Sequence, residues 1–113
     1  MKEILTLNVK ALNPDSKIIE FSGEFDKAGL SEIKSNLDDL VKKFSGSNLI
    51  FDFSHLDFIN SEGIGYLIEI HSFLINREKR LIIVGLKNNV KDVFEAVGID
   101  EIVDIYKSIN DIN

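Results

Sequence analysis

The chain has 113 residues, of which 44% are hydrophobic and 28% are charged, a balance typical of a soluble globular domain and not of a disordered chain. Its formal net charge of −6 disfavours direct binding to nucleic acid or to an anionic membrane surface, because both are negatively charged. The lack of cysteine excludes a disulfide framework, a thiolate zinc site and a cysteine nucleophile. No apolar run is long enough to cross a bilayer, and the first residues lack the order of a signal peptide. We therefore expect one cytoplasmic domain over residues 1–113, with no membrane insertion.

The chain is predicted to open with two strands and a tight turn. Apolar and polar side chains alternate over residues 3–12, which predicts a half-buried strand. Asn13-Pro14-Asp15 is a turn signal, and residues 16–22 form a second predicted strand. The two strands are expected to pair as an antiparallel hairpin.

Helices and strands alternate after this hairpin. Apolar residues at spacings of three and four predict an amphipathic helix of about 17 residues that ends at Ser45-Gly46. A strand is predicted at 48–53, a helix at 61–77 and a strand at 80–86. A third helix through residues 90–97 is followed by Gly98 at its C-terminal cap, and a short strand is predicted at 102–106.

This order predicts a single α/β domain. The initial antiparallel hairpin is followed by parallel strands, so the sheet is mixed, and about three to four helices cover it through right-handed crossovers. With so few helices, one face of the sheet is expected to stay partly open to solvent.

Residues 49–67 place small and polar residues between a buried strand and a helix. The helix is predicted to start near Ser61, whose hydroxyl would lie beside the free amides of the first turn. Gly63 and Gly65 remove side chains there, so another backbone or a ligand can approach closely. The residues alone also allow a simpler interpretation, in which Asn60 or Ser61 is only the N-cap of the helix.

The same stretch resembles the signature of the STAS domain, the fold of the anti-sigma factor antagonists. That signature is an apolar strand ending in Asp, a small or polar residue two positions later, and then Asp-Ser/Thr-Ser/Thr/Ala-Gly-apolar-Gly-x-Leu. The positions that match it are Asp52, Ser54, Leu56, Phe58, Ile59, Ser61, Gly63, Ile64, Gly65 and Leu67. Gly23-Glu24-Phe25-Asp26 resembles the family's segment before its first helix, and residues 93–99 resemble its third helix and cap. The resemblance extends over nearly the whole chain.

The resemblance implies a regulatory protein that is phosphorylated on Ser61. In the family, the matching serine or threonine is phosphorylated by a partner anti-sigma factor kinase and dephosphorylated by a metal-dependent serine phosphatase. The chain itself is then expected to be no enzyme and to use no cofactor or metal. Asn60 departs from the family's usual Asp, and Glu62 from its usual small residue. Asn60 would weaken phosphorylation if the Asp orients the hydroxyl or recruits the kinase, whereas Glu62 places a negative charge at the helix start, which the helix dipole favours.

The second predicted helix is apolar on two faces. The face expected to pack on the sheet comprises Ile64, Leu67, Ile68, His71 and Ile75. The second stripe comprises Tyr66, Ile70 and Phe73. Such a helix is either buried twice, here against a neighbouring helix, or exposed for a partner. The predicted docking surface joins this stripe to the Ser61 loop and the turn at residues 23–26, and comprises Gly23, Glu24, Asp26, Asp57, Asn60, Ser61, Glu62, Gly63, Gly65, Tyr66, Ile70 and Phe73.

Catalytic alternatives lack residues that they need. A serine hydrolase would need a base for Ser61; the only histidines are His55 and His71, and His71 shares a face with apolar helix residues. No Gly-x-Ser-x-Gly elbow is present, because Ser61 precedes its glycines. The pair Gly63 and Gly65 lacks the lysine and the further glycines of a phosphate-binding loop.

Two alternatives involve Asp52. A metal site with His55 and Asp57 is disfavoured, because their positions in a strand and its exit point the three side chains in different directions. A receiver-like domain phosphorylated on Asp52 would need an acidic pair for Mg²⁺ at the end of the first strand, and residues 10–13 contain no acid.

The alternative that stays open keeps the fold and changes the role. STAS domains also serve as non-phosphorylated scaffolds, as subunits of lipid-transport assemblies and as tails of anion transporters. A single free-standing domain agrees best with the antagonist class, and we expect a monomer or a weak dimer.

Overall fold

The structure is a computed structural model that describes residues 4–112. Five strands form one sheet in the order β1-β2-β3-β4-β5. β1 (Thr6–Asn13) pairs antiparallel with β2 (Ser16–Phe25). β3 (Asn48–Ile59), β4 (Arg80–Val84) and β5 (Asp104–Tyr106) follow with parallel pairing. The predicted mixed sheet is confirmed.

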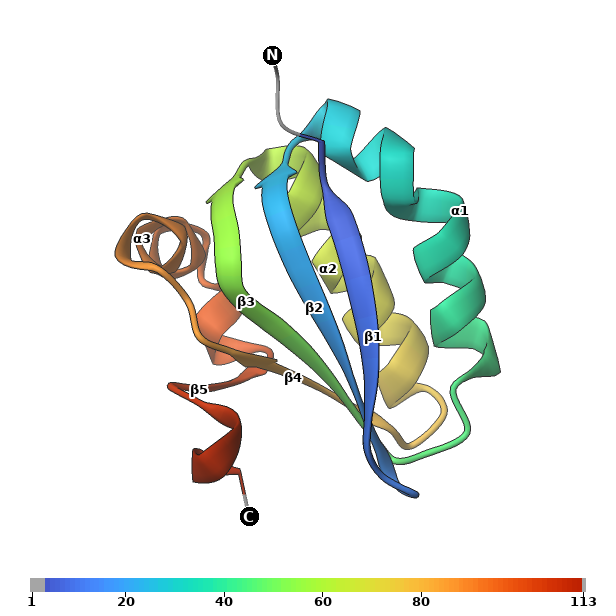
Figure 1. Cartoon of the computed structure of the whole chain (residues 1–113). Helices are drawn as coiled ribbons and strands as arrows, with labels where there is room; N and C mark the ends of the chain where they lie inside the picture. Colours follow the sequence, from blue (N-terminus) through green and yellow to red (C-terminus); the bar gives the residue numbers. More distant parts are fainter. Residues whose placement is uncertain (1–3, 113) are drawn as a thin grey trace.

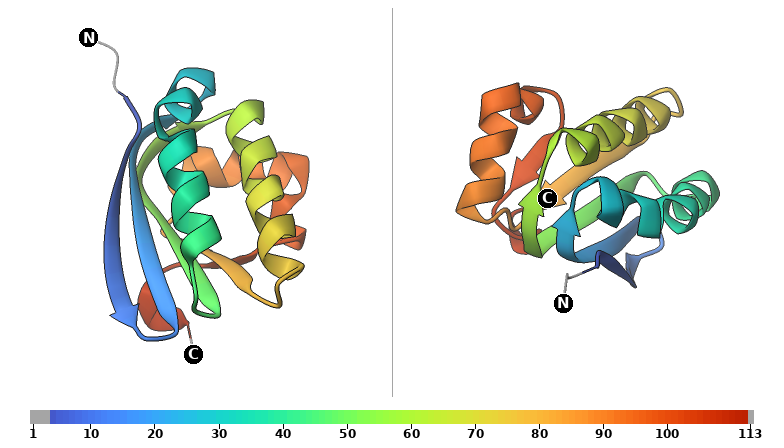
Figure 2. Two further views of the ribbon diagram at one scale, coloured as in Figure 1. Left: turned by 90° about the vertical axis from the view of Figure 1, so that its right-hand side faces the viewer. Right: turned by 90° about the horizontal axis from the view of Figure 1, so that it is seen from above.

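Three α-helices connect the strands within the described residues. These are α1 (Lys27–Lys43), α2 (Ser61–Ile75) and α3 (Asn88–Val97) (Figure 1). The 3₁₀ turn η1 (Ile99–Glu101) follows α3, and η2 (Ile109–Asp111) follows β5. α1 and α2 lie side by side on one face of the sheet, and α3 lies toward the β4–β5 end (Figure 2). This arrangement confirms the predicted α/β fold.

The core lies between the sheet and these helices. Phe21, Phe51 and Phe53 are fully buried, and the Phe21 ring lies 4.8 Å and 4.9 Å, centroid to centroid, from the other two rings. Phe94 of α3 meets Phe53 edge to face at 6.3 Å. Buried aromatic rings contribute the largest apolar areas of a small domain, so this cluster ties β2, β3 and α3 together.

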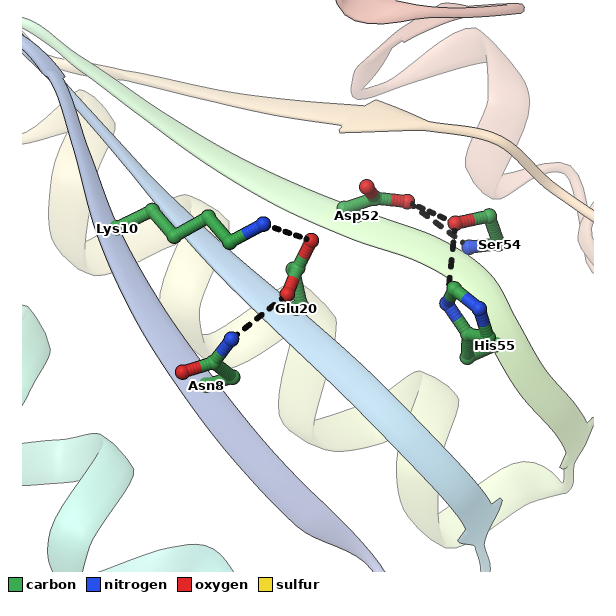
Figure 3. Close-up of polar contacts among 6 residues, drawn as sticks. All are labelled: Asn8, Lys10, Glu20, Asp52, Ser54 and His55. Atoms are coloured by element: carbon green, nitrogen blue, oxygen red, sulfur yellow. Dashed lines mark hydrogen bonds and ion pairs between the residues drawn. The ribbon is translucent and has the colours of Figure 1, made fainter.

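The other face of the sheet is partly open, as expected. Four aliphatic side chains there are covered by the C-terminal segment: Ile18, Ile50, Ile82 and Val84. Polar side chains of β1, β2 and β3 also lie on this face (Figure 3). There Asn8 Nδ2 donates to Glu20 Oε1 at 2.9 Å, and the Lys10 ammonium lies 3.0 Å from Glu20 Oε2. The hydrogen bond from Asn8 is the larger cause and the contact with Lys10 the smaller, and together they hold the pKa of Glu20 below its ordinary value.

Two strands are longer than predicted. β2 continues to Phe25 and β3 to Ile59, so the turn expected at residues 23–26 and the loop expected after residue 53 are mostly strand. The two strands keep pairing in parallel to this end, with Phe25 opposite Ile59, and register shifts near Gly23 accommodate the twist. Both strands therefore continue beyond their apolar runs, because backbone pairing and side-chain burial continue there.

β1 is half-buried only where it begins. Val9 is 42% and Leu12 45% exposed, although the alternation predicted burial for Val9. β1 is an edge strand, and all but one of its eight residues are classed as exposed. The start of the predicted strand, residue 3, lies outside the described residues.

Candidate functional site

Ser61 is the first residue of α2 and its side chain is exposed. The N-cap is Asn60, whose Oδ1 accepts from the backbone amides of Glu62 at 3.1 Å and Gly63 at 3.4 Å. The capping interpretation is thus confirmed for Asn60. The Ser61 hydroxyl donates instead to Glu62 Oε2 at 3.2 Å. Because the cap does not use this hydroxyl, it stays at the surface.

Gly63 allows the first turn of α2 to contact the end of β2. A Cβ at Gly63 would lie 2.6 Å from the Phe25 carbonyl oxygen, a separation that real Cβ atoms essentially never show. The Asn60 amide donates to the same oxygen at 3.3 Å. A Cβ at Gly65, by contrast, would meet nothing within 4 Å, so the predicted close approach occurs at Gly63 and not at Gly65.

The segment before α1 and the start of α2 meet at one edge of the sheet. Asp26 caps α1, its Oδ1 accepting from the Gly29 amide at 2.8 Å. Asp26, Lys27, Ser31 and Asn60 line one shallow depression together with Ala28. Both helices follow parallel strands, whose carboxyl ends share an edge, and this topology brings Asp26 close to Asn60, the residue before Ser61.

Gly23 and Glu24 are less accessible than a docking loop requires. Gly23 is buried with φ +116, and a Cβ there would lie 2.4 Å from the Ile4 carbonyl oxygen. Glu24 is partly exposed at the end of β2. The glycine is therefore needed for backbone packing against the segment that enters β1.

Asp57 lies toward α3. It is exposed near the end of β3 and forms an ion pair with Lys87, and its carbonyl oxygen accepts from Asn89 Nδ2 at 2.7 Å. These contacts join the end of β3 to the start of α3. The strand exit that leads to Ser61 is held in place by them.

The predicted docking stripe on α2 is mostly a packing face. Tyr66 and Ile70 are each only 4% exposed and belong to the main core, so their expected exposure to a partner is wrong. The Tyr66 hydroxyl donates to Asp38 of α1, and the Lys34 ammonium lies 5.2 Å from the Tyr66 ring centroid. Phe73 is partly buried against the core. α1 covers the second apolar face of α2, which agrees with the alternative in which this face is buried against a neighbouring helix.

The contact between Tyr66 and Asp38 shifts both pKa values. Burial, followed by the hydrogen bond to the carboxylate, raises the pKa of Tyr66 far above its ordinary value. The same hydrogen bond lowers the pKa of Asp38. The tyrosine therefore stays protonated and keeps donating at physiological pH.

The solvent face of α2 contains Ser61 and two aliphatic side chains that were predicted to face the sheet. Ile68 is 39% and Ile75 51% exposed. Together with Ser61 they follow spacings of four and three along the helix, and we call the exposed set the Ser61 face: Ser61, Gly65, Ile68, Ser72 and Ile75. Counting these spacings forward from Ser61 would have identified this face in the sequence.

The described residues contain no group of three His, Asp or Glu side chains that could hold a metal ion. His55 lies on the open face, with Nδ1 3.5 Å from Ser54 Oγ, while Ser54 Oγ also donates to Asp52 Oδ1 at 2.7 Å (Figure 3). His71 is partly buried in α2, and Ser61 contacts Glu62 instead of either histidine. In residues 4–112 no helix is long and apolar enough to span a membrane.

Comparison with known proteins agrees with this fold. The family model of the STAS domain matches residues 8–112. The anti-sigma-B factor antagonist of Listeria monocytogenes is 25% identical over 101 residues, covering 89% of this chain and 88% of that protein.

Solved structures share the architecture. An anti-sigma factor antagonist from Mycobacterium paratuberculosis superposes with a TM-score of 0.85 at 20% identity, covering 95% of this chain and 89% of the other. The Bacillus cell fate determinant SpoIIAA in its phosphorylated form has a TM-score of 0.69 at 17% identity, covering 93% and 95%. Because the family model spans residues 8–112, almost all of the described part of the chain, the chain belongs to the STAS domain family.

Proposed function

We propose that this chain is an anti-sigma factor antagonist that changes partners through Ser61. Unphosphorylated, it binds an anti-sigma factor serine kinase; phosphorylation of Ser61 releases the kinase, and a metal-dependent serine phosphatase restores the binding form. The single observation that carries the proposal is the Ser61 hydroxyl, exposed at the start of α2 and not used by the cap. The curated Listeria relative is an anti-sigma factor antagonist by name, and SpoIIAA has been solved in a phosphorylated form.

The fold tolerates a phosphate at Ser61. A phosphoserine carries about −1.5 to −2 charges near pH 7, and the positive end of a helix dipole favours an anion. Asn60 already accepts from the amides of Glu62 and Gly63, so phosphorylation breaks no capping bond. The one contact that must change is the hydrogen bond from Ser61 to Glu62, whose carboxylate then repels the phosphate. The effect of the phosphate therefore falls on the surface and not on the core.

The Ser61 face supplies the docking area in this proposal. Ile68 and Ile75 expose apolar surface in line with the serine. A partner that covers these side chains must also cover or closely approach Ser61. A phosphate buried there without full pairing costs several kcal/mol, and each 1.4 kcal/mol weakens binding about tenfold. A loss on the order of a hundredfold follows.

The two departures from the family pattern have separate effects. Asn60 caps α2 through a side-chain oxygen, which is the role that an aspartate would have there, so the backbone at Ser61 keeps its helical start. Glu62 holds the hydroxyl that the kinase must phosphorylate. We expect Glu62 to slow phosphorylation and Asn60 to leave it possible.

The test uses the anti-sigma factor kinase of the same organism, ATP and peptide mass spectrometry. Phosphate is expected on Ser61, with Ser61→Ala binding the kinase constitutively and Ser61→Asp binding weakly. Ser35→Asp is the matched control, because it adds the same charge at an exposed position of α1, outside the Ser61 face. Phosphate on another residue, or none from an active kinase, would contradict the proposal and favour the non-phosphorylated scaffold or the lipid-transport subunit.

A further inference from the structure

A cavity lies between α3 and β5, and no residue of the Ser61 face lines it. It has a volume of about 620 Å³, within the range of small-molecule sites. It is lined by residues that follow β4 and β5, at the edge where α/β sheets commonly bind ligands. Nothing in the proposed partner switch uses this space.

The floor of the cavity is apolar. Leu86, Phe94 and Ile105 line it, and all three belong to or pack against the main core. Phe94 is fully buried, whereas Leu86 and Ile105 are only partly buried. A ligand with an apolar body would cover their remaining surface.

The rim of the cavity is charged differently at its two ends. Lys91, in the first half of α3, and Lys107, directly after β5, line the end at which β4 and β5 finish, and Asn88 lies there too. Glu95, near the end of α3, and Asp100, in η1, line the opposite end. Lys91 and Glu95 are four positions apart in α3, which is roughly 6 Å along the helix axis.

These charges are not neutralised by one another. Within residues 4–112, no ion pair or side-chain hydrogen bond involves the two lysines or the two acids of the rim. In a chain whose net charge is −6, two unpaired lysines on one rim form a local basic end. The acids at the other end match a cation.

From this polarity we infer that the cavity binds a small zwitterionic molecule, with a carboxylate held by Lys91 and Lys107 and an amine held by Glu95 and Asp100. Its apolar or aromatic body lies over Leu86, Phe94 and Ile105. Asp100 and Lys107 lie beyond opposite ends of β5, whose three residues span roughly 10 Å, so the ligand is expected to carry its two charges on either side of an apolar body, unlike α-amino acids, whose two charges adjoin. ω-Amino acids and aminomethyl-benzoates belong to the class that has the required separation.

The experiment uses 4-(aminomethyl)benzoate as the probe and ¹H–¹⁵N correlation spectra of the full chain as the readout. Two analogues lack one charge each, 4-methylbenzoate and 4-methylbenzylamine. Saturable shifts are expected at the amides of Gly85, Leu86, Phe94 and Lys107, with a dissociation constant of about 1 mM for a ligand of this size. The zwitterion is expected to bind at least about fivefold more tightly than either analogue.

Two variants test whether binding depends on the arrangement of the charges or only on the presence of the cavity. The double variant Lys91→Glu with Glu95→Lys keeps the composition and reverses the charges along α3, and it is expected to lose most of the preference for the zwitterion. Ser61→Ala is the control that should bind the probe unchanged, so failure of the partner switch does not affect this test. Equal binding of all three compounds, shifts confined to other residues, or no saturable shift would each overturn the inference.

Discussion

Replacing Tyr66 with phenylalanine removes one hydroxyl from between α1 and α2 and keeps the ring in place. The lost hydrogen bond has a charged acceptor, Asp38, and such bonds contribute about 1.5–3 kcal/mol. The Asp38 side chain is 35% exposed and keeps Lys34 at 3.0 Å, so the remaining carboxylate is partly compensated. We therefore expect a loss of about 1–2 kcal/mol in the free energy of unfolding, which lowers Tm by roughly 4–8 °C in a domain of this size.

The loss of unfolding free energy in Tyr66→Phe should depend on pH in a defined direction. The lowered pKa of Asp38 means that its contribution to stability is complete above its ordinary value of 3.8 and disappears as the pH falls through the lower folded value. The raised pKa of Tyr66 means that its contribution is complete below 10.0 and is lost only at more alkaline pH. The difference between the wild type and Tyr66→Phe is thus constant around neutrality and shrinks in strong acid.

Urea unfolding followed by circular dichroism at about pH 7, 5 and 3 measures both effects. A double-mutant cycle with Asp38→Asn assigns the loss to the pair, and Asp39→Asn, which breaks only the exposed pair with Lys43, is the matched control with little effect. Kinase affinity should stay within about twofold of the wild type, because Tyr66 is buried. Unchanged stability together with a large loss of kinase affinity would refute this reasoning and restore the docking interpretation of the stripe.

Three further outcomes are expected. Ile68→Ala should weaken kinase binding about tenfold at unchanged Tm, measured by calorimetry; an unchanged affinity would remove Ile68 from the docking surface. Gly63→Ala should destabilise by more than about 2 kcal/mol because its Cβ meets backbone, whereas Gly65→Ala should be neutral or stabilise by up to about 1 kcal/mol; equal shifts in Tm would contradict the packing described. Asn60→Ala should cost about 1 kcal/mol in chemical unfolding and Ser61→Ala much less, and the reverse order would mean that Ser61 is the cap.

Local patterns determined much of this protein. The spacing of apolar residues predicted α1 at its observed length of 17 residues, and Gly98 ends α3 in the left-handed conformation expected of a cap. The motif around Ser61 placed the candidate site at the start of a helix, where the structure has it. These features depend on residues close together in the chain, so periodicity and capping chemistry are sufficient to predict them.

Only the tertiary structure decided which of those residues are accessible. α2 is apolar on two faces, and the position of α1 buries Tyr66 and Ile70 while Ile68 remains exposed. Gly63 and Gly65 look alike in the sequence, yet only Gly63 meets the backbone at the end of β2. Burial is set by contacts between segments far apart in the chain, here α1 with α2 and β2 with β3, and single-chain periodicity carries no information about which neighbour covers a given face.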